Sequence, residues 1–227
     1  MKVLILGATG MVGQGVLREC LLDTGVSQVL TLGRTPPAVT HAKLTNIVHA
    51  DLHDLAPIED SLRGIDACFF CLGVSSLGMS EADYRRVTLD LTLAIAGTLV
   101  RTSPQLCFVY VSGAGTDSSE RGASMWARVK GRTENELMRL PFRAVWGFRP
   151  GAIQPLHGAR SKTGWIHAFY VVLGPLLSGL RRLFPDRLLT TESIGRAMLI
   201  AARGGDVRQV AEAPAIHALS QGRVDGR

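Results

Sequence analysis

The chain has 227 residues, of which 46% are hydrophobic and 19% charged, so its composition excludes a disordered or fibrous protein. The net charge of +6 raises nucleic-acid binding as an alternative. However, the sequence lacks the basic stripe, zinc motif and aromatic–basic pattern of such proteins, and its densest basic group is only Arg181, Arg182 and Arg187. We therefore expect no nucleic-acid partner and a positive surface that suits a phosphorylated small molecule.

The first apolar run, Val3–Leu6, breaks into glycines and then continues as a helical pattern. A strand that feeds a tight turn and opens a helix presents unpaired backbone N–H groups at the positive end of the helix dipole. This pattern predicts a pyrophosphate site, and hence a bound dinucleotide, over an ordinary glycine-rich turn. The residues that we expect at the phosphates are Gly7, Thr9, Gly10, Met11, Val12 and Gly13.

Apolar runs alternate with helical patterns along the rest of the chain. The predicted strands are Val3–Leu6, Gln28–Leu32, Asn46–Val48, Ala67–Leu72, Leu106–Val111 and Arg143–Phe148. The predicted helices are Val12–Leu22, Glu81–Arg101, Ser124–Leu140 and Ile194–Ala202. This alternation predicts the α/β class, with a doubly wound parallel sheet that helices cover on both faces.

We expect one domain over residues 1–227. Residues 1–150 form the cofactor-binding core, and residues 151–227 are too few for a second domain with its own core. They suit a small helical cap on the substrate side, followed by a polar tail whose last residues, 221–227, fray.

One apolar segment, Trp165–Leu180, raises the alternative of a membrane contact. It contains Gly174 and Pro175 and falls short of the roughly 20 residues that a spanning helix needs. We predict a buried or pocket-lining helix here, with contact to a membrane surface as the alternative.

The four cysteines are Cys20, Cys68, Cys71 and Cys107. Cys68 and Cys71 have the spacing of a redox or zinc pair, but residues three apart on a strand face opposite sides of the sheet. We therefore predict buried free thiols, which fit a reducing cytoplasm. The start of the chain does not resemble a signal peptide.

The end of the second predicted strand indicates which dinucleotide binds. An NAD site usually places an acid about 20 residues past the glycines, to hold the ribose hydroxyls. Here that position holds Arg34, and no Asp or Glu lies between Gln28 and Thr40. A guanidinium can grip a 2′-phosphate, so we predict NADP(H) over NAD(H). The alternative is a merely solvated Arg34.

After the third predicted strand, Asp51 can accept a hydrogen bond from the adenine amino group and Leu52 can cover the ring. The same stretch holds His49, His53 and Asp54, which raises the alternative of a metal cluster. We expect no metal, because the adenine already accounts for the acid and no third strong ligand is placed.

With these motifs the chain resembles the atypical branch of the short-chain dehydrogenase/reductase superfamily. This branch includes epimerase/dehydratase-like, NmrA-like and Tat-interacting-protein-like proteins. The motifs that carry the resemblance are the glycine loop, Asp51-Leu52, Cys71-Leu72-Gly73, Val111-Ser112, Lys130 and Arg149-Pro-Gly-Ala-Ile153.

The resemblance implies catalytic roles for Ser112 and Lys130. In the family, Ser polarises the substrate oxygen, Lys holds the nicotinamide ribose, and a Tyr four residues before that Lys transfers the proton. Here the Tyr position is Trp126. An indole N–H cannot act as an acid or base near neutral pH, so Trp126 is a packing residue or a stacking floor.

Other residues could supply the proton. Tyr84, Tyr110 and Tyr170 are the candidates, and no spacing argument selects one of them. The resemblance further implies that a loop after the fourth strand borders the adenosine ribose and pyrophosphate, and that a loop after the sixth touches the nicotinamide. The residues so implied are Cys71, Leu72 and Gly73, then Pro150, Gly151 and Ile153.

Three functions fit the sequence. The first is an NADP-dependent reductase with slow or unusual hydride transfer to a small carbonyl substrate of unknown identity. The second is a non-catalytic NADP(H)-binding redox sensor, and the third is a nucleotide-sugar epimerase or dehydratase. A homodimer is expected only by analogy with relatives.

Overall fold

The computed structural model describes residues 1–159, 186–205 and 207–223. Seven parallel strands form one sheet in the order β3-β2-β1-β4-β5-β6-β9. Because the order reverses between β1 and β4, the predicted α/β fold with a doubly wound sheet is confirmed. The strands are β1 (Lys2–Leu6), β2 (Gln28–Gly33), β3 (Leu44–Val48), β4 (Ala67–Phe70), β5 (Cys107–Val111), β6 (Ala144–Arg149) and β9 (Arg208–Glu212).

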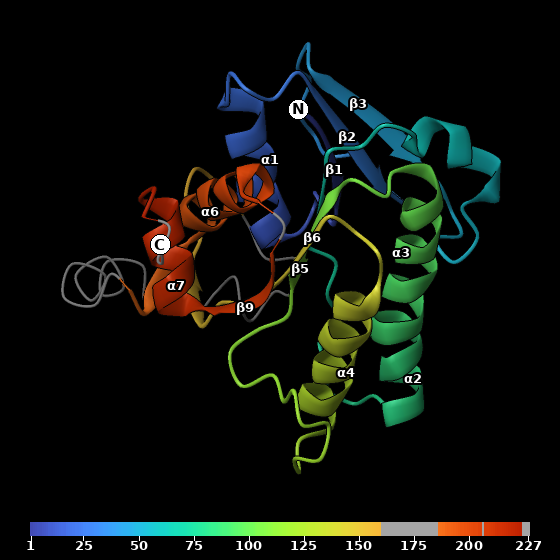
Figure 1. Cartoon of the computed structure of the whole chain (residues 1–227), viewed down its shortest axis with the longest axis vertical. Helices are drawn as coiled ribbons and strands as arrows, with labels where there is room; N and C mark the ends of the chain where they lie inside the picture. The colour runs from blue at the N-terminus through green and yellow to red at the C-terminus, as the bar shows by residue number, and fades with distance from the viewer. Residues whose placement is uncertain (160–185, 206, 224–227) are drawn as a thin grey trace.

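Helices cover both faces of the sheet (Figure 1). On one face lie α1 (Met11–Leu22), α6 (Thr191–Arg203) and α7 (Ala213–Ser220). On the other lie the short helix η1 (Ala56–Leu62), α3 (Leu91–Thr102) and α4 (Met125–Arg139). The side chains of each strand alternate between the two cores, so β1 sends Val3 and Ile5 to the first and Leu4 and Leu6 to the second.

The same alternation separates the two central cysteines. Cys68 packs in the core beneath α3 and α4, whereas Cys71 packs against the core beneath α1 and α6. Both are free thiols, so the expectation of unpaired cysteines on opposite faces is confirmed.

The predicted helix Glu81–Arg101 is continuous but irregular. It runs through α2 (Glu81–Arg85), one π-helical turn η2 (Arg86–Asp90) and α3. A π turn adds a residue to the helical repeat and so changes which side chains share a face. Apolar periodicity alone did not reveal it.

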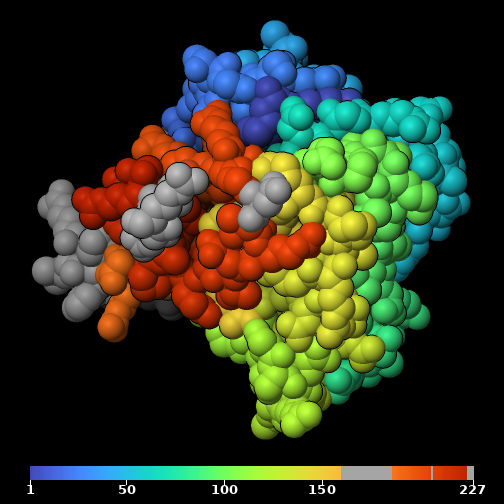
Figure 2. All heavy atoms as spheres, in the orientation of Figure 1, coloured from blue at the N-terminus to red at the C-terminus, as the bar shows by residue number. Residues whose placement is uncertain are grey.

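The described chain after β6 contains strands as well as helices. It forms a small parallel sheet from β7 (Ala152–Gln154) and β8 (Leu188–Thr190), and then α6, β9 and α7. Strand β9, which the sequence analysis did not include, pairs with β6 at the edge of the main sheet. Figure 2 shows the spheres of this carboxyl-terminal part against the blue amino-terminal part. The single-domain organisation stays a prediction.

The apolar segment Trp165–Leu180 and Tyr170 lie outside the described residues. Among the helices that the structure describes, none combines the length and apolar character needed to cross a membrane.

Helices α1 and α6 cross with their backbones in close approach. A Cβ atom on Gly15 would lie 2.5 Å from Thr191 Cβ, and one on Gly195 would lie 2.8 Å from Glu19 Cγ. These glycines let the helix that begins at the glycine loop pack directly on a carboxyl-terminal helix. The glycine loop is therefore anchored by residues far along the chain.

We predict that Gly15→Ala lowers the free energy of unfolding by about 1–3 kcal/mol, because the added methyl overlaps Thr191. Chemical denaturation measures this change. The matched control is Gly97→Ala in α3, where a Cβ meets nothing within 4 Å. Because alanine favours the helix, this control should raise stability by about 0.5–1 kcal/mol. Equal losses in both variants would contradict the close approach.

Candidate functional site

A cavity of about 460 Å³ opens at the carboxyl ends of β1, β2 and β4. This is the switch point of the sheet, where ligands of doubly wound proteins bind, and the volume is in the range of cofactor sites. Nine of the predicted site residues line it: Gly7, Thr9, Gly10, Arg34, Asp51, Leu52, Cys71, Leu72 and Gly73.

The glycine loop has a geometry that only glycine allows. Gly7 adopts a φ of +80°, and a Cβ there would lie 2.6 Å from the Cys71 carbonyl group. A Cβ on Gly13 would lie 2.0 Å from the Gly7 carbonyl oxygen. The turn after β1 is therefore pressed between β4 and the first turn of α1.

The start of α1 is open to an anion. Gly10 is its N-cap, donates its N–H to Gly7 O at 2.9 Å, and has no side chain with which to cap the helix. Helices α2 and α6, in contrast, begin with the capping side chains of Ser80 and Thr190. The first-turn N–H groups and the dipole of α1 fit the pyrophosphate of a dinucleotide. The residues present thus fit a dinucleotide cofactor.

The part of the cavity where the sequence predicts the adenosine lies beyond β2 and β3. Arg34 follows β2 directly, with Thr35 and Pro37 beside it on the cavity wall. Asp51 accepts a hydrogen bond from the His53 backbone N–H at 2.9 Å, and Leu52 is buried. These positions are compatible with the predicted contacts to a 2′-phosphate and an adenine ring.

Sequence reasoning missed several lining residues. Val87 and Leu91 reach the cavity from the π turn and the start of α3, and Thr31 from inside β2. Their apolar or neutral character gave no signal by itself. The four-residue spacing of Val87 and Leu91 is a weak signal that a helix face borders the crevice.

Three predicted loop residues, Met11, Val12 and Gly13, lie at the start of α1 but not on the wall of this cavity. Ser112, Lys130, Pro150, Gly151 and Ile153 do not line it either. They group instead beyond the carboxyl ends of β5 and β6. There the Ala114 N–H donates to Pro150 O at 2.9 Å, and Ile153 is buried.

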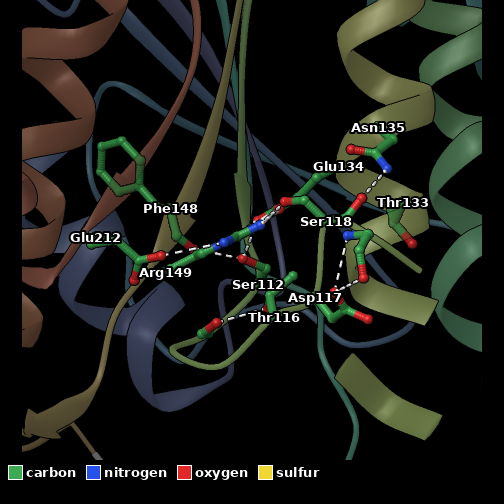
Figure 3. A network of polar contacts seen from close by, with 12 residues as sticks. Ser112, Thr116, Asp117, Ser118, Thr133, Glu134, Asn135, Phe148, Arg149 and Glu212 are labelled. Atoms are coloured by element: carbon green, nitrogen blue, oxygen red, sulfur yellow. Dashed lines mark hydrogen bonds and ion pairs between the residues drawn. The ribbon is translucent and has the colours of Figure 1, made fainter. Parts of the chain in front are cut away.

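Ser112 is turned toward the protein interior. It is 5% exposed, and its Oγ donates to Glu134 Oε1 at 2.5 Å on helix α4 (Figure 3). The same Oγ lies 3.1 Å from Phe148 O. A hydroxyl has one proton to donate, and here a buried carboxylate accepts that hydrogen bond. In this arrangement Ser112 does not offer its proton to the crevice, so its predicted catalytic role is untested.

Glu134 belongs to a buried ion pair. Arg149, at the end of β6, donates to its Oε2 from Nη2 at 2.5 Å and from Nε at 3.1 Å. The Arg149 side chain also lies 3.3 Å from Glu212 and 2.5 Å from Ser118 Oγ. Figure 3 shows the guanidinium between the two carboxylates. These contacts join β5, β6, α4 and the loop before α4.

Lys130 lies one helical turn before Glu134 on α4. It is partly buried, and its Nζ donates to the Ser112 carbonyl oxygen. Burial lowers the pKa of Lys130 to about 8, and the Glu134 charge opposes this shift. Lys130 can therefore lose its charge within a mildly alkaline range.

The remaining candidates for proton transfer are enclosed. Tyr84 and Tyr110 are 2% and 1% exposed, and burial raises the pKa of both. Trp126 is half-buried beside Tyr84 and Val129, with its ring edge against Gly115. Trp126 therefore packs within the α2–α4 layer. Tyr170 lies outside the described residues.

Comparison with known proteins now identifies the family. The chain matches the NAD dependent epimerase/dehydratase family over residues 3–121, which include the glycine loop and the end of β5. It belongs to this family. The predicted membership of the atypical short-chain dehydrogenase/reductase group is thereby confirmed, and the cofactor expected from the family is NAD(P).

Two curated relatives illustrate the match. The protein HTATIP2 of Rattus norvegicus is 29% identical over 154 residues, which are 67% of this chain and 62% of the rat protein. The mitochondrial protein FMP52 of Eremothecium gossypii is 29% identical over 179 residues, 78% of this chain and 77% of the relative. The chain thus spans less than two thirds of the rat protein.

Solved structures share the fold. A UDP-glucose 4-epimerase superposes with a TM-score of 0.69 at 16% identity, over 96% of this chain and 80% of that one. A short-chain dehydrogenase/reductase from Burkholderia thailandensis gives 0.66 at 18% identity, over 97% and 93%. At these identities the likeness establishes the architecture alone.

We predict that Lys130 titrates with a midpoint near pH 8, well below the ordinary lysine value of 10.5. NMR of protein that carries ¹³C-labelled lysine follows this titration, since the chain has only Lys2, Lys43, Lys130 and Lys162. The ammonium is present below the midpoint and the neutral amine above it. Lys130→Arg should remove the shifted signal. A Lys130 midpoint at the ordinary value would contradict its burial.

Proposed function

We propose that this protein binds NADP(H) in the crevice and senses it, without transferring a proton by the usual route of its family. The observation that carries the proposal is the hydrogen bond from Ser112 Oγ to the buried Glu134 carboxylate. Ser112 Oγ thus donates its proton to Glu134 and not to a substrate oxygen, and Trp126 stands where the family places the tyrosine acid.

The glycine loop supports dinucleotide binding by itself. Its close contacts place a glycine N-cap, which has no side chain, at the start of α1, and the cavity beside it extends from the glycine loop to Arg34. Such a site needs no catalytic group in order to bind. A bound reduced nicotinamide carries a transferable hydride, and the protein contributes orientation.

The preference for NADP(H) is supported by Arg34. It lies on the cavity wall directly after β2, where an NAD site usually has an acid. A guanidinium pairs with a 2′-phosphate through charge-assisted hydrogen bonds. NADH lacks that phosphate and would leave Arg34 without this partner.

A slow reductase is the second candidate, and Lys130 favours it. Its ammonium lies at the end of β5, and its pKa of about 8 lets it exchange a proton near neutral pH. A small carbonyl compound would be the substrate. Oxidation of NADPH that depends on a carbonyl compound would favour the reductase over the sensor.

Arg34→Ala tests the cofactor preference. We expect NADPH affinity to fall roughly 10- to 100-fold and NADH affinity to change much less, since only the former loses a charged hydrogen bond. Isothermal titration calorimetry measures both. Arg63→Ala, which removes an arginine paired with Asp60 away from the cavity wall, is the control. Equal losses for both dinucleotides, or tighter binding of NADH by the native chain, would reject NADP(H).

Trp126→Tyr tests whether the missing acid prevents turnover. We expect the native chain to bind NADPH but not to oxidise it above background with a panel of aldehydes and ketones. The variant should raise that rate roughly tenfold or more, because a tyrosine acid returns four residues before Lys130. Absorbance of NADPH follows the reaction. Trp126→Phe, which alters packing without adding an acid, should give no gain. Clear carbonyl-dependent oxidation by the native chain would favour the reductase instead.

A further inference from the structure

The proposed function assigns no chemical step to Glu134, although its carboxylate is buried at the ends of β5 and β6. The Glu134 side chain is 1% exposed and contacts Ser112 and Arg149 (Figure 3). A Cβ on Gly147, in the strand beneath, would lie 2.9 Å from Glu134 Oε1. The carboxylate is thus enclosed by β5, β6 and its own helix. Burying a charged group is costly, so its place requires a physical reason.

Ser112 connects this carboxylate to Lys130. Its hydroxyl donates to Glu134, while its carbonyl oxygen accepts from Lys130 Nζ. The two ionic side chains stand four residues apart on α4, so they project from one helix face. The single residue at the end of β5 therefore holds both of them.

Glu134 also acts on Lys130 through its charge. Burial favours the neutral amine, and the negative charge of Glu134 favours the ammonium and raises the pKa of Lys130. Arg149 contacts both carboxylate oxygens and so fixes their orientation. The carboxylate is consequently held in one place relative to Lys130.

We infer that Glu134 is a positioning residue for the dinucleotide, which keeps the Lys130 side chain cationic and in place at the end of β5. The inference rests on the proposed function, because Lys130 is the residue expected to hold the nicotinamide ribose. It extends that function by making the affinity for NADP(H) depend on pH through Glu134.

The other titratable groups on the elements packed against α4 either stay neutral near pH 8 or are ionised and paired. Tyr84 on α2 and Tyr110 on β5 stay neutral, since burial raises the pKa of both. Asp117, in the loop before α4, is held ionised by hydrogen bonds within that loop, which lower its pKa to about 2. The ion pairs around α4 are Arg128–Glu81, Arg86–Asp83, Arg85–Asp90, Arg101–Glu59 and Arg149–Glu212.

The decisive experiment compares NADPH affinity across pH in the native chain and in Glu134→Gln, using the fluorescence of bound NADPH. In the native chain we expect affinity to fall as pH rises through about 8, where Lys130 loses its charge. In the variant the midpoint should move down by about one pH unit, because the opposing charge is gone. A merely structural role would weaken binding equally at every pH and leave the midpoint unchanged.

Glu212→Gln is the matched control. Glu212 contacts the same arginine from the solvent side and is 54% exposed. Its loss should leave the midpoint where it is in the native chain. An equal shift in this control would overturn the assignment to Glu134, because any acid near Arg149 would then suffice.

Glu134→Asp keeps the charge and shortens the side chain, and it carries the test if Glu134→Gln does not fold. Its midpoint should stay close to the native value while NADPH affinity falls. A midpoint that drops by about one full unit in this variant would overturn the role of the charge.

NMR of the labelled lysines in the ligand-free proteins tests the role of Glu134 separately from the proposed binding of NADP(H). A Lys130 midpoint that falls in Glu134→Gln supports the inference, and one that stays overturns it, whether or not NADPH binds. Absence of NADPH binding by the native chain at every pH would overturn the proposed function instead.

Discussion

The close contact between the turn after β1, the end of β4 and the first turn of α1 is the constraint on which the site depends. Side chains at Gly7 or Gly13 would overlap backbone atoms. Because these positions are glycines, the start of α1 comes up against the sheet with its N–H groups directed at the crevice. The α1–α6 crossing at Gly15 and Gly195 then secures this helix from the other side. The site that we propose for the phosphates is thus formed by backbone packing.

The site has two halves, the cavity at the carboxyl ends of β1, β2 and β4 and the polar group at the ends of β5 and β6, and they differ in how their polar groups are used. At the adenosine end, Arg34 and Asp51 lie on the cavity wall, where a ligand can reach them. At the end of β5 and β6, Ser112, Glu134 and Arg149 satisfy one another. The polar groups of the first half are thus accessible to a ligand, whereas the Ser112 hydroxyl of the second half points into the protein. This contrast is the physical basis for proposing binding without the family's proton transfer.

Lys130 is the exception in the second half. It is partly buried, and its contact is to a backbone oxygen rather than to a carboxylate. A cation in such a place is sensitive to the charges around it, and Glu134 is the acid that acts on it. A titratable group thus remains at this end of the site, where the sequence places Trp126 at the predicted tyrosine position.

The sequence by itself determined the fold class, the glycine loop and nine of the residues that line the cavity, because those features depend on local periodicity and on glycines that tolerate close approach. It also placed Cys68 and Cys71 on opposite faces. Only the tertiary structure revealed the π turn that brings Val87 and Leu91 to the cavity, the edge strand β9 and the direction of the Ser112 hydroxyl. Strand β9 and the Ser112 hydroxyl depend on partners distant in the chain, which are β6 and Glu134. No local pattern encodes which of several acceptors a buried hydroxyl will meet.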